Sequence, residues 1–393
     1  MKYLSTNVSG KDVFGGIHTH LREHVNLSPQ HDFYILELCE SREYPQTSNL
    51  HVNRINSSTG FSNIKGMLNG AESIEDLKKR GEGLIQEYQK NIKEINPDVI
   101  LLLGTSLPSY FLLNAVVREG CLDKILHSYS GVVEMERGGY ARKLQGLLDM
   151  FGKEFTSEQI RDNVVYIFPS EHCKNVVEKL HRVKLENSYI IPNGVSDEFL
   201  NNSLRIPPKE LSLGYVGRFS PVKNPDFFMN LKDEINEPVL LKIVTDIVTA
   251  TNSKGGSSLL QKMNKGEVLY FHPRHAHELS KFYKRELSTT VIPSLFETFC
   301  NVATESIISG TPVLLSDRAG VREVFERYGL EDLIFSIDSR ESFSSAMDFA
   351  KSMDFRINPE LSREMYFELS WDKIIEKYNN IAERVREKSL IMV

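Results

Sequence analysis

Short apolar runs alternate with longer amphipathic segments along the whole chain, and the alternation restarts near residue 212. This pattern is typical of parallel β-sheets whose strands are joined by helices. After a short N-terminal strand, the runs predicted as strands in the first half are Tyr34–Leu38, Val99–Leu103, Lys124–Ser128, Val164–Phe168 and Ser188–Ile191. In the second half they are Leu213–Val216, Leu240–Val244, Val268–Phe271, Thr289–Ile292 and Pro312–Leu315. The sequence therefore predicts an α/β fold with two Rossmann-like domains in series, which would face each other across a cleft.

The length of 393 residues fits two such domains, because a domain commonly takes about 150 residues. The Asn, Ser and Pro content of Asn201–Pro208 predicts a linker, so we expect domains at residues 1–200 and 201–370. Two longer segments have helical spacing of apolar residues: Asp76–Ile95, which contains two glycines, and Trp371–Lys388. The second predicts a C-terminal helix within residues 371–393, and a return to the N-terminal domain is one option for it.

Composition excludes several classes of protein. A net charge of −6 disfavours a general nucleic-acid binder, which needs a basic face. The four cysteines form no Cys-x-x-Cys pair, which predicts reduced thiols rather than a zinc site or disulfide framework. The N-terminus turns polar at once, and runs such as Val99–Leu103 are too short to span a bilayer. We therefore expect a cytoplasmic protein, with peripheral contact at the inner membrane face left open.

The segment Phe14–Leu21 follows the N-terminal strand and opens an amphipathic helix. Its Gly15 and Gly16 would let the backbone approach a ligand closely, and a helix N-terminus offers N–H groups to an anion. Taken alone, a plain tight turn explains the same two glycines.

The segment Gly214–Asn224 ends a predicted strand with Arg218, and Lys223 follows five residues later. Arginine makes forked contacts with phosphate oxygens and lysine supplies a point charge, so the two suit a diphosphate. A solvated loop with ordinary surface cations is the alternative.

The segment Pro293–Ser306 carries Glu297 in a loop and Glu305 about two turns into the following helix. These carboxylates can accept hydrogen bonds from sugar hydroxyls, while the helix N-terminus receives phosphate. A capped helix with one acidic residue is the bland alternative. A hydrolase acid–base pair is disfavoured, because no apolar pocket flanks Glu297 to raise a carboxyl pKa.

Histidines and one asparagine complete the candidate set. Asn193 lies in an Asn-Gly turn that either is an ordinary turn or lines a cleft, and His127 ends a strand, where most histidines are structural. The group His272, His275 and His277 does not predict a metal site, because Pro273 breaks regular ligand spacing. No Asp-x-Asp pair occurs, so we expect no metal and no cofactor, with cationic side chains and backbone binding the diphosphate.

These segments, in this order, resemble the retaining glycosyltransferases of the GT-B fold, family 4 (glycosyl transferases group 1). The resemblance rests on FGGIHTHLREH, IIPNGV, GYVGRFSPVKN and, most specifically, the Glu-x7-Glu element in PSLFETFCNVATESIISGTPVLLSD. It implies that Gly15 and Gly16 face the donor, that Arg218 and Lys223 bind its diphosphate, that Glu297 binds the sugar and that Glu305 binds the ribose. It also implies that the backbone of Phe299, Cys300, Asn301 and Val302 meets the phosphates, that His127 lies beside the reacting carbon and that Asn193 lies near the cleft.

The resemblance implies transfer of a hexosyl or N-acetylhexosaminyl group from a nucleotide diphosphate sugar to a hydroxyl acceptor (EC 2.4). A UDP-sugar is the favoured donor, with GDP-mannose next. The acceptor would be a glycan, a lipid-linked glycan, a cell-surface polymer or a small molecule, recognised by Ser41–Ala71 and Gly131–Phe155. A nucleotide-sugar epimerase of GT-B fold, or a non-catalytic nucleotide-sugar-binding partner subunit, is the alternative.

Three departures from the family pattern stand out. Cys300 occupies a position that is usually glycine, and Asn224 follows the lysine where glycine is usual. A Gly-Asp-Gly-like turn is replaced by Val244-Thr245-Asp246, so we expect an unusual loop over Ile247–Ser258.

Overall fold

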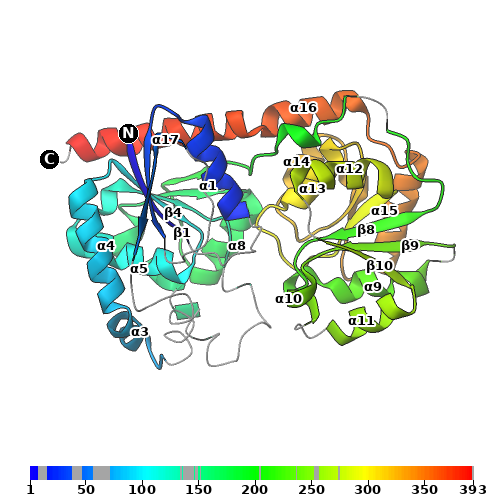
Figure 1. Cartoon of the computed structure of the whole chain (residues 1–393), viewed down its shortest axis with the longest axis horizontal. Coiled ribbons are helices and arrows are strands. Elements are labelled where there is room, and N and C mark those ends of the chain that lie inside the picture. The colour runs from blue at the N-terminus through cyan, green and yellow to red at the C-terminus, as the bar shows by residue number, and fades with distance from the viewer. Residues whose placement is uncertain are drawn as a thin grey trace. The chain divides into compact units, whose positions relative to one another are not determined.

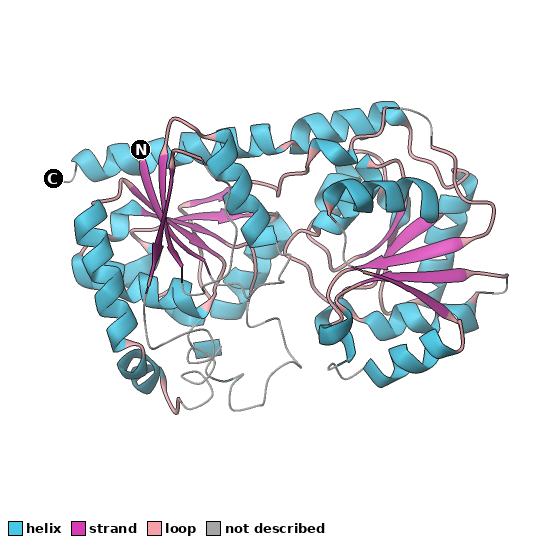
Figure 2. Ribbon diagram, viewed as in Figure 1, coloured by secondary structure: helices cyan, strands magenta, loops and turns pink. Residues whose placement is uncertain are grey.

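The computed structural model describes the chain except for residues 8–15, 38–46, 56–70, 133–134, 136–145, 147–148, 151, 203–204, 236, 252–255, 273–274 and 392–393. The described residues divide into two compact units. The first unit holds the described residues up to Asn193 together with those from Ile374 onward, and the second holds Gly194–Lys373. Each unit contains one parallel β-sheet with helices beside it (Figures 1 and 2).

The sheet of the first unit has seven parallel strands in the order β3-β2-β1-β4-β5-β6-β7. The strands are β1 Lys2–Asn7, β2 Asp32–Glu37, β3 Leu50–Arg54, β4 Val99–Leu103, β5 Ile125–Ser128, β6 Val165–Phe168 and β7 Ser188–Ile190. The helices include α1 Gly16–Leu27, α3 Ile74–Arg80, α4 Glu82–Ile95, α5 Leu107–Glu119, α7 Glu158–Arg161 and α8 Glu171–His181. Every residue of β4 is buried, as expected for a central parallel strand covered on both faces.

The sheet of the second unit has six parallel strands in the order β10-β9-β8-β11-β12-β13. They are β8 Ser212–Val216, β9 Leu240–Val244, β10 Val268–Phe271, β11 Thr289–Ile292, β12 Val313–Ser316 and β13 Ile334–Phe335. The helices include α9 Pro225–Glu234, α10 Ile247–Thr251, α11 Gly256–Asn264, α12 Ala276–Glu286, α13 Asn301–Ile308, α14 Arg322–Arg327, α15 Arg340–Ser352 and α16 Pro359–Leu369. In both sheets the strand order reverses at one point, between β1 and β4 and between β8 and β11.

The predicted α/β fold with two parallel sheets is confirmed. Every strand predicted from an apolar run is present, and the predicted ends differ from the observed ones by at most two residues where both are described. Strands β3 and β13 were not predicted. The first is a half-exposed edge strand with polar residues such as His51 and Arg54, and the second has two residues, so neither produces an apolar run.

The single helix predicted over Asp76–Ile95 is wrong, because the chain breaks into α3 and α4 at Gly81. A Cβ atom at position 81 would lie 2.2 Å from the ring of Phe111 on α5. The absence of a side chain therefore lets this turn pack closely on α5, and the packing, rather than the helical spacing, decides where α3 ends.

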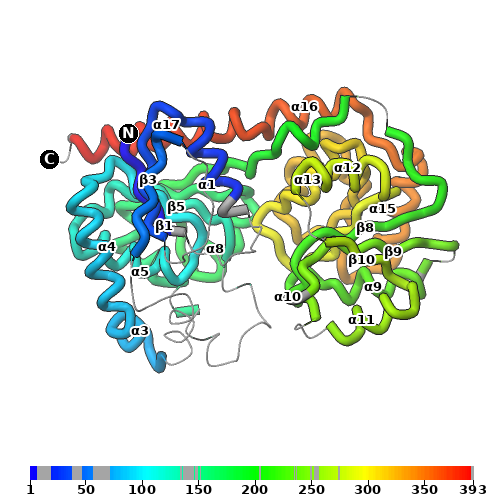
Figure 3. The backbone as a smooth tube through the Cα atoms, viewed as in Figure 1, coloured from blue at the N-terminus to red at the C-terminus, as the bar shows by residue number. Residues whose placement is uncertain are grey.

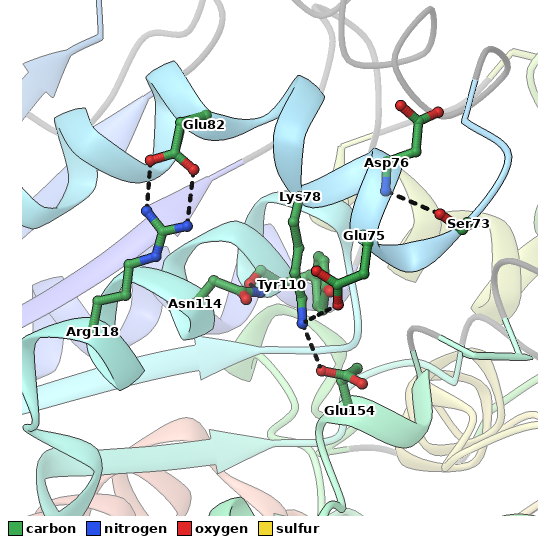
Figure 4. Close-up of polar contacts among 9 residues, drawn as sticks. All are labelled: Ser73, Glu75, Asp76, Lys78, Glu82, Tyr110, Asn114, Arg118 and Glu154. Carbon is green, nitrogen blue, oxygen red and sulfur yellow. Dashed lines mark hydrogen bonds and ion pairs between the residues drawn. The ribbon is translucent and has the colours of Figure 1, made fainter.

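Charged side chains fasten α3 and α4 to the first unit (Figure 4). Arg118 on α5 donates both arms of its guanidinium to Glu82, at 2.6 and 2.8 Å. Lys78 bridges Glu75 on its own helix and Glu154, each at 3.4 Å. The forked Arg118–Glu82 pair fixes orientation as well as distance, which a single lysine contact does not.

The segment Asn201–Pro208, predicted as a linker, is partly buried: Asn201 and Arg205 are buried, whereas Ile206 is 82% exposed. Arg205 is 3% exposed, and its guanidinium donates to the carbonyls of Lys284 and Phe355. Those carbonyls lie at or beyond the C-terminal ends of α12 and α15, where the helix dipole favours a cation. At Arg205, therefore, the segment is attached to these helix ends and is not a free connection.

The C-terminal helix α17, Trp371–Ile391, belongs to the first unit from Ile374 onward (Figure 3). Tyr378 and Asn379 on α17 bond with the first unit. The Tyr378 hydroxyl lies 2.8 Å from Ser128 Oγ, and Asn379 Oδ1 accepts from the Tyr3 hydroxyl and from His24 Nε2, both at 2.9 Å. Among the residues described, no helix combines the length and the apolar character needed to cross a membrane.

Candidate functional site

The strand order of the second unit reverses between β8 and β11. In open α/β sheets, ligands bind beyond the carboxyl ends of strands at such a reversal. Arg218 and Lys223 follow β8, and Glu297 follows β11. The structure thus brings three residues from two separate sequence motifs to the same edge of the sheet.

The loop after β8 is fixed through its backbone. Gly217 has a φ of 147°, which favours glycine, and its N–H donates to the carbonyl of Val244 at 3.0 Å. The buried Tyr215 hydroxyl donates to the carbonyl of Arg218 at 2.6 Å. Burial raises the pKa of Tyr215, and the negative charge of Glu297 raises it further. The positive charge of Arg218 lowers it, so both charged groups lie near the phenol. Arg218 itself is exposed to solvent.

Lys223 and Glu297 form an ion pair at the centre of this edge. Lys223 Nζ lies 2.5 Å from Glu297 Oε2, and Ser294 Oγ donates to the other carboxylate oxygen, Oε1, at 2.8 Å. The Leu295 N–H donates to the carbonyl of Val222 at 2.8 Å, which ties the two loops together. The side chains are 21% and 11% exposed, so the pair is partly shielded from water and retains more strength than a surface pair.

The loop that follows β12 bonds to the backbone of Glu297. The Glu297 N–H donates to the carbonyl of Arg318, and the Gly320 N–H donates to the carbonyl of Glu297, each at 3.2 Å. These bonds form an isolated parallel bridge between Glu297 and Ala319. The carboxylate therefore projects from a backbone that is bonded on both sides.

Helix α13 begins at the same edge and carries Glu305. The Tyr283 hydroxyl on α12 lies 3.4 Å from Glu305 Oε2. Burial raises the pKa of Glu305 to about 7, against the opposing effect of the Tyr283 hydrogen bond. Phe299 and Cys300 are buried just before the helix, and Asn301 and Val302 in its first turn are half-buried.

Cys300 lies within the field of three charged groups of this site, Glu297, Lys223 and Glu305. Burial raises the pKa of its thiol, with Glu297 adding to the effect and Lys223 opposing it, and Glu305 contributes a smaller increase. The thiol therefore stays protonated and is a poor nucleophile. Its backbone has a φ of 109°, the left-handed region that favours glycine, which agrees with the glycine expected at this position.

Glycine at position 300 is expected to give a more stable protein than alanine, which reverses the usual order. Cys300→Gly and Cys300→Ala both remove Sγ, so their difference isolates the Cβ atom at positive φ. Such strain costs a non-glycine residue on the order of 1–3 kcal/mol, against about 0.5–1 kcal/mol for the extra chain entropy of glycine. Urea unfolding should show Cys300→Gly to be about 1 kcal/mol more stable. A less stable glycine variant would contradict this account.

The carboxyl ends of β9 and β10 form the next part of this edge. The Tyr270 hydroxyl lies 3.1 Å from the Thr245 carbonyl and 3.3 Å from His272 Nδ1. The unusual loop predicted over Ile247–Ser258 is wrong where it is described, because α10 begins directly at Ile247 and α11 at Gly256.

His275 and His277 stack with ring centroids 6.2 Å apart. Within the described parts of the chain, no group of three or more potential ligands could hold a metal ion.

The residues predicted in the first half lie in the first unit. Gly15 falls outside the described residues, Gly16 opens α1, and Asn193 is half-buried at the point where the chain leaves the first unit for the second. His127 is 1% exposed and packs 4.4 Å from the ring of Tyr129, and burial lowers its pKa to about 3. It is therefore neutral and shielded from solvent, as in the structural alternative. The roles of these residues at a donor site stay predictions.

The acceptor-recognising segments predicted at Ser41–Ala71 and Gly131–Phe155 lie mostly outside the described residues.

Sequence reasoning missed two supporting side chains. Ser294 is the second residue after β11 and lies three residues before Glu297, so its position offered a usable signal. Tyr283 comes from α12, 22 residues before Glu305, and nothing in the spacing connects the two. Contacts between neighbouring helices have no local signature in a single sequence.

Residues 196–365 match the family model described as glycosyl transferases group 1, which covers the second unit almost entirely. The chain is 25% identical over 194 residues to the D-inositol 3-phosphate glycosyltransferase of Rhodococcus erythropolis, covering 46% of this chain and 43% of that protein. It is 27% identical over 164 residues to the enzyme of the same name from Stackebrandtia nassauensis, covering 37% of each. The aligned region spans less than half the length of these curated relatives.

Solved structures match the whole chain at low sequence identity. A sucrose-phosphate synthase from Thermosynechococcus elongatus has a TM-score of 0.74 at 15% identity, with 98% of each chain covered. Anabaena Alr3699/HepE in complex with UDP and glucose has a TM-score of 0.68 at 12% identity, covering 98% of this chain and all of that one. These likenesses establish the fold, and the predicted GT-B architecture is confirmed.

Proposed function

We propose that this protein is a retaining glycosyltransferase that moves a hexosyl or N-acetylhexosaminyl group from a nucleotide diphosphate sugar to a hydroxyl acceptor. The observation that carries the proposal is the juxtaposition of Lys223, Glu297 and the start of α13 at the strand-order reversal of the second unit. A cation and a helix N-terminus suit a diphosphate, and a neighbouring carboxylate suits sugar hydroxyls. The family match over residues 196–365 supports the same assignment.

In this proposal each charged side chain has one task. Arg218 and Lys223 bind the diphosphate, Glu297 accepts hydrogen bonds from the donor sugar, and Glu305 accepts them from the ribose. The cations and the backbone N–H groups at the start of α13 would balance the diphosphate charge without a metal ion. A UDP-sugar is the favoured donor, because the HepE structure is described with UDP-glucose.

The proposed reaction is a front-face substitution that retains the anomeric configuration. The acceptor oxygen bonds to the anomeric carbon while the bond from that carbon to the diphosphate oxygen breaks, and the leaving diphosphate takes the acceptor proton. Negative charge grows on the leaving group during this step. Arg218 and Lys223 would stabilise that charge, which is the largest contribution that preorganised groups usually make to catalysis.

The acceptor is proposed only as a hydroxyl compound. The relatives named as D-inositol 3-phosphate glycosyltransferases act, by that name, on a phosphorylated polyol. Because the aligned region covers less than half of those proteins, their acceptor is one candidate beside glycans and lipid-linked glycans.

A ligand screen followed by product analysis tests the proposal. The melting temperature should rise with UDP or GDP and with the matching sugar nucleotide, because ligands that bind only the native state stabilise it. Sugar transfer to an acceptor should then be detected by mass spectrometry. Conversion of the donor sugar without acceptor would indicate an epimerase instead, and binding without turnover on any acceptor would indicate a partner subunit. No response to any nucleotide would refute the proposal.

Donor binding is expected to weaken below pH 7 because the ionised carboxylate of Glu305 accepts stronger hydrogen bonds from ribose than the protonated acid does. Its pKa is raised to about 7, so the protonated fraction grows as the pH falls through that value. Affinity for UDP should therefore fall as the pH falls below 7, with a limit of about tenfold per pH unit if only the ionised form binds. Calorimetry between about pH 5.5 and 8.5 measures this slope, and Glu305→Gln provides the reference in which only the nucleotide phosphate titrates. Equal slopes for the two proteins would contradict the role given to Glu305.

A further inference from the structure

Both carboxylate oxygens of Glu297 already have donors. Oε2 pairs with Lys223 Nζ at 2.5 Å, and Oε1 accepts from Ser294 Oγ at 2.8 Å. The Glu297 side chain is 11% exposed, so it has little contact with water. In the structure, Lys223 and Glu297 therefore pair with each other. Their proposed ligands are different: a diphosphate for Lys223 and a sugar for Glu297.

A diphosphate at this site competes with Glu297 for the ammonium group of Lys223. If the ammonium turns toward phosphate, Glu297 Oε2 loses its partner while largely buried, and leaving a buried charged acceptor unsatisfied is costly. A sugar hydroxyl attached to that diphosphate would replace the lost donor. A nucleotide without a sugar would not supply a new donor to Glu297. A free sugar would have to displace Lys223 from Glu297 without giving Lys223 an anion to pair with.

We propose that the Lys223–Glu297 ion pair couples recognition of the diphosphate to recognition of the sugar, so that the site selects a sugar carried on a diphosphate over either part alone. This inference rests on the proposed function. Ser294 acts as a positioning residue, because its bond to Oε1 keeps Oε2 directed toward Lys223.

The coupling makes a counterintuitive prediction for UDP without sugar. Glu297→Gln removes the ion pair and leaves Lys223 available, so UDP should bind more tightly than it does to the wild type, by about tenfold for a coupling of 1.4 kcal/mol. The preference for UDP-glucose over UDP should shrink in the same variant. If Glu297 contacted only sugar, the affinity for UDP would not change.

Simple repulsion between Glu297 and phosphate would also make UDP bind more tightly after Glu297→Gln. A double-mutant cycle with Lys223→Met separates the two causes. In the Lys223→Met background there is no ion pair to break, so coupling predicts that adding Glu297→Gln changes the UDP affinity less than about twofold. Repulsion acts through space and would give the same gain in both backgrounds.

The experiment is calorimetry of UDP and UDP-glucose binding to the full chain, at one pH near 8, for the wild type, both single variants and the double variant. GDP and GDP-mannose replace them if they give the larger thermal shift. The expected result is a gain in UDP affinity on Glu297→Gln that disappears in the Lys223→Met background. No gain in the wild-type background, or an equal gain in both, would overturn the coupling while leaving the proposed function intact.

Two controls keep this outcome interpretable. Thermal unfolding of each variant reports whether it folds, and Glu297→Asp, which shortens the side chain by one methylene, replaces Glu297→Gln if that variant does not. Failure of the wild type to bind any nucleotide would overturn the proposed function, and the coupling with it.

Discussion

Arg218→Ala is expected to lower kcat/KM for sugar transfer by about 10²–10³-fold. Arg218 follows β8 at the strand-order reversal, and its side chain is exposed while its carbonyl is fixed by the Tyr215 hydroxyl. A guanidinium placed in this way can donate two hydrogen bonds to a diphosphate whose charge grows as the sugar departs. Its loss should therefore reduce kcat more than it raises KM, and steady-state kinetics with saturating acceptor measures both.

Two variants serve as controls for that measurement. Arg218→Lys keeps the charge but not the forked geometry, so we expect an activity between those of the wild type and the alanine variant. Arg285→Ala removes an exposed arginine on α12 and should leave activity unchanged. A folded Arg218→Ala protein that transfers sugar at the wild-type rate would refute the proposed role of the guanidinium.

The sheets could be predicted from sequence because buried parallel strands require continuous apolar runs. Val99–Leu103 and Thr289–Ile292 were placed at their observed bounds for that reason, since each is buried along its whole length. The two helices α3 and α4 could not be separated in the same way. Their break depends on the approach of Gly81 to Phe111, which is 30 residues away in the chain.

The charged residues of the candidate site could be predicted where they lie directly after strands. Arg218, Lys223 and Glu297 were each placed from such a position, and the structure pairs the second with the third. The pairing itself was not predicted, because it depends on the order β8-β11 in the sheet and not on sequence spacing. The same limit applies to the predicted linker Asn201–Pro208, because the burial of Arg205 within it has no local signal in the sequence.

Cys300 shows how a departure from a family pattern acquires a physical meaning. The sequence indicated only that a side chain stands where glycine is usual, and the structure adds that the backbone there has a φ of 109°. The site therefore keeps a conformation that suits glycine while carrying a buried thiol next to Glu297 and Lys223. We infer that the start of α13 requires this backbone conformation at position 300, whether the residue there is glycine or cysteine.

The first unit is expected to lose stability steeply as the pH falls below 6.5, because three of its histidines are buried and neutral. Burial lowers the pKa of His20 and of His127 to about 3, and that of His24 to about 4. His20 packs against Tyr378 with ring centroids 4.4 Å apart, and His24 bonds to Asn379, so two of the three lie under α17. Protonation of either would place a charge in the contact that fastens this helix to the first unit.

The sign of the effect follows from proton uptake. Below pH 6.5 the unfolded chain binds protons at these histidines while the folded chain does not, so the free energy of unfolding falls as the pH falls. Each histidine removes about 1.4 kcal/mol per pH unit until its folded pKa is reached, which gives about 4 kcal/mol per unit for the three. Between pH 6.5 and 5 the loss reaches about 5 kcal/mol, the lower end of the stability of an ordinary domain, so we expect the first unit to be strongly destabilised at pH 5.

Hydrogen exchange under increasing urea, read at the amides of β1 and β4, measures the stability of the first unit separately from the second. His20→Phe keeps a ring against Tyr378 without a titrating group and should reduce the pH slope by about one third. His277→Gln, which changes an exposed histidine of the second unit, should leave the slope unchanged. Protection at β1 and β4 that stays constant from pH 7 to 5 would show that these rings are not buried and neutral in solution. If His20→Phe slows acid-induced exchange in α17 more than in the sheet, the contact between this helix and the histidines is the first to open.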